Sequence, residues 1–158
     1  MVDTSTVKLR NAKRADLPLI QSWLRQNSLP DSDVSDVLDG LFIMQHQNVD
    51  VGIGGIEAYA PDGLLRSVVI AEPFRGKGYG KQLCHLLVNQ AIAQNITTLF
   101  LLTETAPQFF ASLGFEPIER QSAPTSLQGT TEFSQLCPAS AICMKRNLDA
   151  IAMLENAG

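Results

Sequence analysis

The chain has 158 residues, of which 45% are apolar, so it is long enough for one domain with a hydrophobic core. Its 16 acidic residues outnumber 12 basic ones and give a net charge of -4, which argues against nucleic acid as a partner, because phosphate binding favours a basic excess. An acidic chain can still bind an anionic cofactor, since backbone N–H groups bind phosphate without lysine or arginine.

The first elements form a strand, a helix and a loop. The run Val7–Asn11 predicts a short strand. Asp16 is typical of a helix N-cap and Pro18 of a first helical turn, which predicts a helix that ends near Asn27. The Asp- and Ser-rich stretch Leu29–Gly40 predicts a loop that contains a short helix.

Three strands are predicted next, the last two joined by a tight turn. Apolar and β-branched runs predict strands at Leu41–Gln45, Val49–Tyr59 and Leu64–Ile70. The sequence Pro61-Asp62-Gly63 predicts the connecting turn, with Asp62 and Gly63 as the two central residues of a hairpin.

A strand–helix–strand unit follows. A helix is predicted from about Lys81 to Asn95, since Cys84, Leu87, Val88 and Ala91 form one apolar stripe. Thr98–Leu102 predicts a central strand, and Ala106–Leu113 predicts a short helix ended by Gly114. The last predicted elements are strands at Phe115–Ile118 and Ala141–Lys145 and a short helix after Asn147, with no assignment for 120–140. This order predicts an α+β fold of α/β/α layers around one sheet, as a single domain over 1–158 with a core at about 7–146 and a tail at 147–158.

The most informative stretch is a glycine-rich turn between a buried strand and a helix. It reads Arg75-Gly76-Lys77-Gly78-Tyr79-Gly80. Glycines let backbone N–H groups approach a ligand, and a helix N-terminus adds partial positive charge, so the turn predicts a pyrophosphate cradle. The P-loop pattern fails because Lys81 and Gln82 follow Gly80, and the dinucleotide fingerprint lacks its third glycine and its acidic residue.

The turn and the strand before it resemble motif A of the GNAT superfamily of acyltransferases, Gln/Arg-x-x-Gly-x-Gly/Ala. A second match, Ala106 to Phe115, is similar to a later motif of that family in which a helix ends in Gly-Phe. The resemblance implies a mixed, V-splayed sheet and an enzyme that transfers acetyl from acetyl-CoA to an amine. It also implies coenzyme contacts at Val68, Val69, Ile70, Arg75, Gly76, Lys77, Gly78, Tyr79, Gly80, Lys81, Thr105 and Phe110.

Phe110 stands where many members of the family carry a tyrosine that protonates the leaving thiolate. Phenylalanine has no proton to donate, so that role is vacant or filled by Thr103, Thr105 or water. The absence of this proton donor costs little activity if the thiolate, whose conjugate acid has a pKa of about 8.5, leaves without being protonated.

Glu57 and Arg66 are charges within otherwise apolar strands. If Asp62-Gly63 forms the hairpin turn, Arg66 lies opposite Tyr59 and is a diagonal neighbour of Glu57. One interpretation is a structural ion pair. The other is functional: Arg66 binds a substrate carboxylate, with Thr103 as a second substrate contact, and Glu57 is the catalytic group that orients or deprotonates the amine.

Two further stretches narrow the resemblance. The run Phe133 to Ala141 with Cys143-Met144, and Thr103 to Ala106 with Phe109-Phe110, are similar to the arsenic-resistance N-acetyltransferases of bacterial ars operons. Those are related to enzymes that acetylate glutamate-like amino groups, including those of arsinothricin and phosphinothricin. The resemblance implies a small amino-acid-like amine as substrate.

Several alternatives stay open. The amine could belong to a peptide or protein, or the chain could be a non-catalytic CoA-binding sensor or partner subunit, and a homodimer is a further option. Three cysteines, an odd number, and the absence of a signal-like N-terminus or of a run of about 20 apolar residues predict a cytoplasmic protein without membrane contact. His46 and His85 stand alone and no metal site is predicted, while the cysteines read as packing residues.

Overall fold

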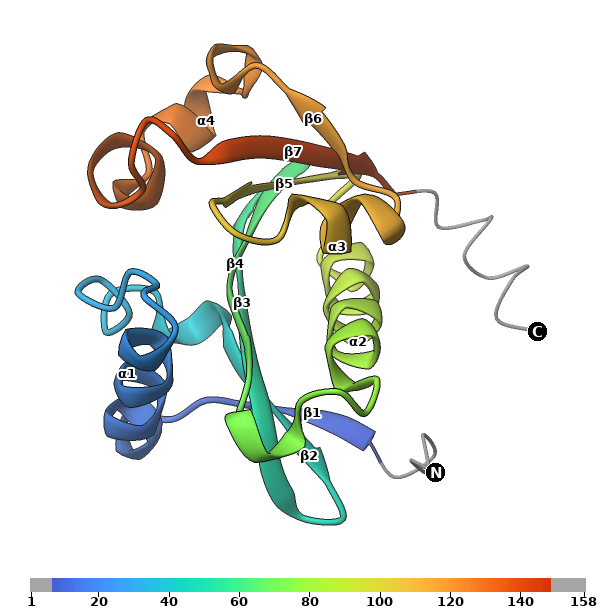
Figure 1. Cartoon of the computed structure of the whole chain (residues 1–158). Coiled ribbons are helices and arrows are strands. Elements are labelled where there is room, and N and C mark those ends of the chain that lie inside the picture. Colours follow the sequence, from blue (N-terminus) through green and yellow to red (C-terminus); the bar gives the residue numbers. More distant parts are fainter. Residues whose placement is uncertain (1–6, 149–158) are drawn as a thin grey trace. The chain divides into compact units, whose positions relative to one another are not determined.

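The computed structural model describes residues 7–148 and confirms the α+β class (Figure 1). The strands form one mixed sheet, here in hydrogen-bonded order: β1 (Val7–Asn11), β2 (Leu41–His46), β3 (Val49–Tyr59), β4 (Asp62–Ile70), β5 (Thr98–Thr103), β7 (Ile142–Asn147) and β6 (Glu116–Ile118). The described chain divides into two compact units, 7–57 with 66–87 and 58–65 with 88–148. Whether they act as one domain stays a prediction, and the predicted tail helix lies outside the described residues. Within 7–148, no helix has the length and apolar character to cross a membrane.

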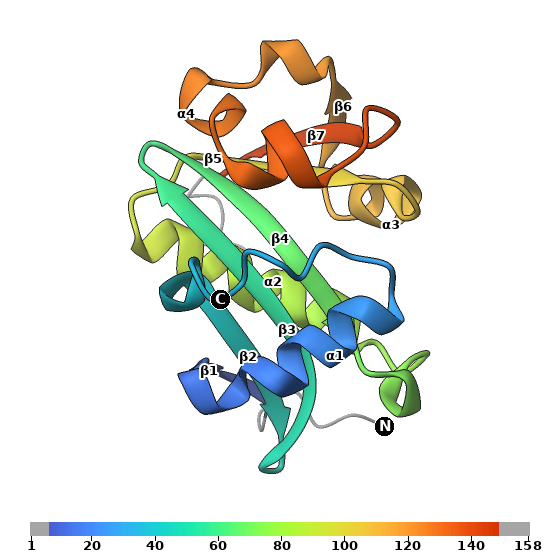
Figure 2. The same cartoon turned by 90° about the vertical axis from the view of Figure 1, so that its left-hand side faces the viewer.

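In the first unit, two helices cover opposite faces of the strands. Helix α1 (Leu17–Gln26) packs on one face, and the first part of α2 (Tyr79–Ala93) packs on the other (Figures 1 and 2). The core under α1 consists of Ile20, Leu24, Val34, Leu41, Ile43, Ile53 and Val69. On the α2 side, β3 carries glycine instead. A Cβ added at Gly54 would lie only 2.5 Å from Leu87 Cδ1, so the missing side chain lets the helix approach the strand.

Asp16 occupies the N-cap position of α1 as predicted, but its carboxylate does not cap the helix. Its two oxygens accept hydrogen bonds from the guanidinium of Arg10 at 2.9 Å each. This bidentate pair lowers the pKa of Asp16 below its usual value, since the ionised carboxylate is the form that Arg10 binds. The pair therefore ties β1 to the start of α1.

The hairpin turn between β3 and β4 lies two residues before its predicted place. Ala60 and Pro61 form the turn and β4 begins at Asp62, so the prediction of Asp62-Gly63 as the turn is wrong. Proline cannot donate to a strand ladder, which favours it in the turn. Gly63 instead pairs with Leu99 of β5, and a Cβ there would meet Ile96 at 2.8 Å, so packing explains this glycine.

The second unit is built around β5. This strand pairs in parallel with β4 and antiparallel with β7, whose other edge holds β6. Helix α3 (Pro107–Ser112) ends before Gly114, whose φ of 94° confirms its predicted role after the helix. The core of this unit contains Leu64, Phe100, Ala123, Leu127, Phe133 and Cys143.

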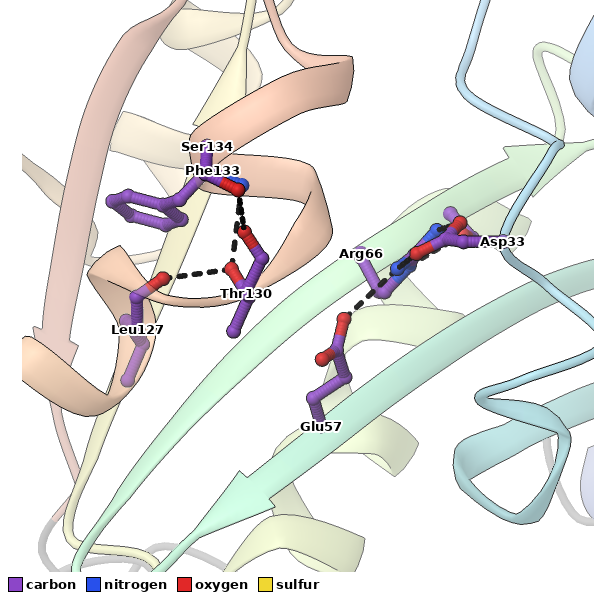
Figure 3. Close-up of polar contacts among 8 residues, drawn as sticks. Asp33, Glu57, Arg66, Leu127, Thr130, Phe133 and Ser134 are labelled. Carbon is purple, nitrogen blue, oxygen red and sulfur yellow. Dashed lines mark hydrogen bonds and ion pairs between the residues drawn. The ribbon is translucent and has the colours of Figure 1, made fainter.

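The stretch 120–140, left unassigned by the sequence, folds as a short helix α4 (Thr125–Gln128) and one π-helical turn at Glu132–Leu136. The hydroxyl of Thr130 donates to the Leu127 carbonyl at 2.7 Å and accepts the Phe133 N–H at 3.2 Å, which links the two turns (Figure 3). Arg120 donates to the carbonyls of Phe133, Cys137 and Pro138 and so holds the stretch together. Polar side-chain contacts, rather than an apolar period, define this segment.

We expect Cys143 to resist alkylation by iodoacetamide at pH 8 in the native protein, with Cys137 reacting faster. Cys143 is buried in the core of the second unit, whereas Cys137 is half-buried. Burial raises the pKa of the Cys143 thiol to about 11, so it stays protonated at a pH where an ordinary thiol, with a pKa of about 8.5, forms reactive thiolate. Peptide mass mapping after a short pulse checks this, and equal labelling of the two cysteines would contradict it.

Candidate active site

The glycine-rich turn at the start of α2 is an open backbone cradle. Gly76 and Gly78 have φ values of 78° and 86°, a region that glycine adopts without strain. A Cβ added at either position would find no atom within 4 Å, so space lies beside both residues. The side chains of the turn do not close it, because residues 75–78 are exposed.

The N–H groups of this turn are available to a ligand. Among residues 7–148, no group accepts a hydrogen bond from the N–H groups of Gly76, Lys77 or Gly78. Helix α2 begins at Tyr79, two residues before its predicted start, and its first turn includes Gly80. The hydrogen bond from Gln82 N–H to the Gly78 carbonyl, at 3.3 Å, closes this turn, so the preceding N–H groups have no partner within the helix. The arrangement is suited to bind an anion.

Two side chains fix the ends of the cradle. Arg75 donates from Nε to the Ile70 carbonyl at 3.0 Å and from Nη2 to Asn27 Oδ1 at 2.7 Å, which ties the turn to the end of α1. Tyr79 is buried, and its hydroxyl lies 2.6 Å from Nδ1 of His46 on β2. His46, expected to stand alone, therefore supports the first turn of α2.

A cavity of about 400 Å³ adjoins the cradle, lined by Val7, Gly78, Lys81, Gln82, His85 and Leu86. Lys81 and His85 are exposed at its wall. The Oε1 atom of Gln82 is buried and has no hydrogen-bond partner among the described residues. The cavity thus offers apolar walls with two basic side chains.

Strand β4 leads into the cradle with an irregular backbone. Ser67 has a φ of 60°, which is uncommon for a residue other than glycine and interrupts the regular alternation of the strand. Beyond it, Val69 is buried in the core under α1, while Val68 and Ile70 are half-buried. The last strand residues before the turn therefore keep part of their surface accessible.

Glu57 and Arg66 form an ion pair, as one of the two interpretations predicted. Nη1 of Arg66 donates to Glu57 Oε2 at 2.8 Å (Figure 3). The same guanidinium is also bound by Asp33, with Nη1 to Oδ2 and Nη2 to Oδ1 at 2.6 Å each. Arg66 is 3% exposed. Its predicted contact with a substrate carboxylate finds no support here, because two carboxylates of the chain already bind the guanidinium.

The other predicted residues lie in the second unit. Thr103 is buried, and its hydroxyl accepts the Ala106 N–H at 3.1 Å just before α3, while Thr105 is exposed. Phe110 packs edge-on against Phe109 and Phe115, with ring centres 5.2 and 5.9 Å away. The structure thus groups Glu57, Arg66 and residues 68–81 in one unit, and Thr103, Thr105 and Phe110 in the other.

Sequence reasoning missed Asp33 and the contact between His46 and Tyr79. The feature of the sequence that could have indicated Asp33 is Arg66 in an apolar strand, since a buried guanidinium needs a carboxylate partner. Four aspartates lie in the stretch Leu29–Gly40, and only the fold selects the one that binds. The histidine contact joins residues 33 positions apart and has no local signal.

Comparison with known proteins gives a family and a fold. The family model described as "Acetyltransferase (GNAT) domain" matches residues 38–117. N-acetylglutamate synthase from Neisseria gonorrhoeae, complexed with coenzyme A and N-acetyl-glutamate, superposes with a TM-score of 0.76 at 18% identity, over 90% of this chain and 35% of that one. The present chain therefore corresponds to about a third of that protein.

Two other solved structures match over nearly their whole length. Rv2747 from Mycobacterium tuberculosis, in complex with CoA, has a TM-score of 0.75 at 20% identity and is covered to 99%, with 90% of this chain. Arabidopsis thaliana Naa50, in complex with a bisubstrate analogue, has a TM-score of 0.66 at 14% identity with the same coverages. At these identities the likeness establishes the fold.

Proposed function

Because the chain belongs to the acetyltransferase (GNAT) family, we propose that it is an acetyl-CoA-dependent N-acetyltransferase that acetylates the amino group of a small amino-acid-like compound. A glutamate analogue such as arsinothricin or phosphinothricin is the proposed acceptor, in line with the resemblance of Thr103 to Ala106 and Phe133 to Ala141 to arsenic-resistance acetyltransferases. A small acceptor agrees with the structural similarity to N-acetylglutamate synthase, which was solved with N-acetyl-glutamate. The chain is also similar in fold to Naa50, which was solved with a bisubstrate analogue.

The single observation that carries the proposal is the open turn at Gly76 and Gly78 with N–H groups that no described residue uses. These groups, with those of Tyr79 to Lys81, would hold the pyrophosphate of acetyl-CoA. The adjoining cavity, with Lys81 and His85 at its wall, has a size and charge suited to the nucleotide end of the coenzyme. The backbone of Val68 to Ile70 would hold the pantetheine arm, with Thr105 and Phe110 as further proposed contacts.

The chemistry needs a neutral amine and a place for negative charge. Glu57 would receive the proton of the substrate ammonium group, directly or through water. A backbone N–H of Val69 or Ile70 would stabilise the charge that develops on the thioester oxygen. Bound acetyl-CoA supplies the acyl group: the amine nitrogen bonds to the carbonyl carbon and the C–S bond breaks. The second proton, which the nitrogen loses as the amide forms, passes through water to the departing thiolate. Phe110 has no proton to give, and a thiol pKa of about 8.5 makes an acid dispensable.

A thiol-release assay with acetyl-CoA and a panel of amines tests the proposal. We expect turnover with glutamate, phosphinothricin or a related amino acid, and much slower turnover with peptides. Turnover with peptides alone would instead support a protein acetyltransferase. Calorimetry with acetyl-CoA and with CoA provides the second measurement, because tight binding without turnover of any amine would support a non-catalytic sensor.

A further inference from the structure

Tyr79 is the buried end of an otherwise exposed turn. Residues 75–78 are exposed, whereas Tyr79, the first residue of α2, is 6% exposed. Its ring packs edge-on against Phe74, with ring centres 6.2 Å apart, so the residues on both sides of the turn meet there. Because its neighbours Gly78 and Gly80 have no side chain to pack, the tyrosine is the residue that can fix the start of the helix.

Among residues 7–148, the hydroxyl of Tyr79 has one hydrogen-bond partner, His46. The hydroxyl lies 2.6 Å from Nδ1 of this histidine, which is the last residue of β2, and the two ring centres are 5.6 Å apart. The bond exists in either neutral tautomer of the imidazole, because Nδ1 can accept from the phenol or donate to it. Loss of the partner would leave a buried hydroxyl unpaired, which is unfavourable. His46 therefore holds Tyr79 in place.

The second nitrogen of His46 indicates what the histidine is for. Its Nε2 atom is buried and has no hydrogen-bond partner among the described residues. Burying a polar atom without a partner is unfavourable, so an apolar side chain would fill the same space at a lower cost. The hydrogen bond to Tyr79 offsets that cost. This contact, rather than packing, accounts for a histidine at the end of β2.

The contact supports the N–H groups proposed to bind the pyrophosphate. These groups, at residues 76–78, have no acceptor within the described chain, and Tyr79 follows them directly. A flexible turn loses conformational freedom when an anion aligns its N–H groups, so a turn that is held in place beforehand binds more tightly. Val7, which pairs with His46 in the sheet, lines the adjoining cavity together with Gly78. The hydrogen bond thus supports this surface from the interior.

We infer that His46 is a positioning residue for the coenzyme: by binding the hydroxyl of Tyr79 from β2, it pre-organises the glycine-rich turn and so raises the affinity for acetyl-CoA. The inference rests on the proposed role of this turn as the pyrophosphate site. It predicts an effect on coenzyme binding and not on acyl transfer once the coenzyme is bound, because the bound pyrophosphate then holds the turn.

Two replacements of His46 that share one shape test the inference. The amide of His46→Asn can donate or accept near the position of Nδ1, whereas the side chain of His46→Leu has the same shape without polarity. For His46→Leu we expect Kd for CoA and KM for acetyl-CoA to rise about tenfold, while saturated kcat and KM for the amine stay within about twofold. His46→Asn should stay within about threefold of the parent Kd. Calorimetry measures Kd, and thiol release measures the rates.

Tyr79→Phe removes the other half of the same hydrogen bond and keeps the ring. It should raise Kd for CoA to the same extent as His46→Leu, and the double variant should bind no more weakly than either single variant, because all three lack one shared bond. If the two single effects instead multiply, the residues act separately and the inference is overturned. Thermal unfolding without coenzyme confirms that each variant is folded.

The remaining outcomes separate the inference from the proposed function. Equal Kd values for His46→Asn and His46→Leu, or a fall in kcat with an unchanged Kd, would leave the hydrogen bond no part in coenzyme binding and would overturn the inference alone. A parent protein that gives no heat with acetyl-CoA or CoA would refute the proposed function, and the inference with it.

Discussion

Gly78→Ala is expected to weaken acetyl-CoA binding by about 100-fold while the protein stays folded. The φ of 86° at this residue strains any side-chain-bearing residue, and the added Cβ would stand in the open space beside the N–H groups proposed to bind the pyrophosphate. A hydrogen bond to a charged group contributes about 1.5–3 kcal/mol, so the loss of one or two accounts for the expected factor. Calorimetric titration with acetyl-CoA and with CoA measures it.

Gly114→Ala is the matched control for backbone strain. Gly114 has a similar φ of 94° but follows α3, where an added Cβ would contact the side chain of Arg146 at 3.4 Å. We expect this variant to lose a comparable amount of stability, on the order of 1 kcal/mol, with an unchanged dissociation constant for the coenzyme. If the Gly78→Ala variant and the parent bind acetyl-CoA with equal affinity, the proposal that this turn binds the pyrophosphate of the coenzyme is wrong.

The sequence predicted most elements because their periods are local. Apolar runs predicted the strands, an apolar stripe predicted α2, and residues typical of helix ends marked α1 and α3, all to within a few residues. The positive φ of Gly76, Gly78 and Gly114 follows from the choice of glycine. Helix α2 starts two residues early because Gly80 lies in its first turn, where glycine costs less than in a helix interior. Hydrophobic periodicity does not show whether a helix includes a glycine near its end, so it cannot fix the first residue of such a helix.

The predicted contact between Glu57 and Arg66 is present in the structure, although the hairpin turn from which it is predicted is wrong. The predicted hairpin placed Arg66 opposite Tyr59, whereas a Cβ at Gly55 would lie 3.4 Å from Arg66 Cγ, so the arginine is displaced along β3 from 59 to 55. Side chains alternate with a period of two, and a shift of four residues returns them to the same face. Glu57 lies midway between the two positions, so it is a diagonal neighbour of Arg66 in both cases.

The third member of that cluster could not be predicted. Asp33 lies in a loop 33 residues before Arg66, and its contact depends on how Val34 enters the core under α1. No period or turn pattern carries that information, because the contact arises from tertiary packing. The same holds for 120–140, where the carbonyls bound by Arg120 shape the backbone.

The largest catalytic effect is expected for Glu57→Gln, with a fall in kcat of about 100- to 1000-fold at pH 7. Glutamine keeps the volume and an oxygen for the Arg66 hydrogen bond, and Asp33 still neutralises the guanidinium, so the fold should survive. The variant cannot take up the amine proton and depends on the fraction of substrate that is neutral in solution. KM for acetyl-CoA, measured by thiol release, should not change.

The pH profile separates this loss from a structural one. Below the pKa of the substrate amine, the neutral fraction grows tenfold per pH unit, so kcat/KM of the Glu57→Gln variant should climb by about that factor per unit toward the amine pKa. Asp50→Asn is the matched control, because Asp50 is a carboxylate of the same strand with its own arginine partner, Arg10, at 3.4 Å. It should retain the parent profile. A Glu57→Gln variant with a parent-like kcat, or one with a pH-independent deficit, would show that another group receives the proton.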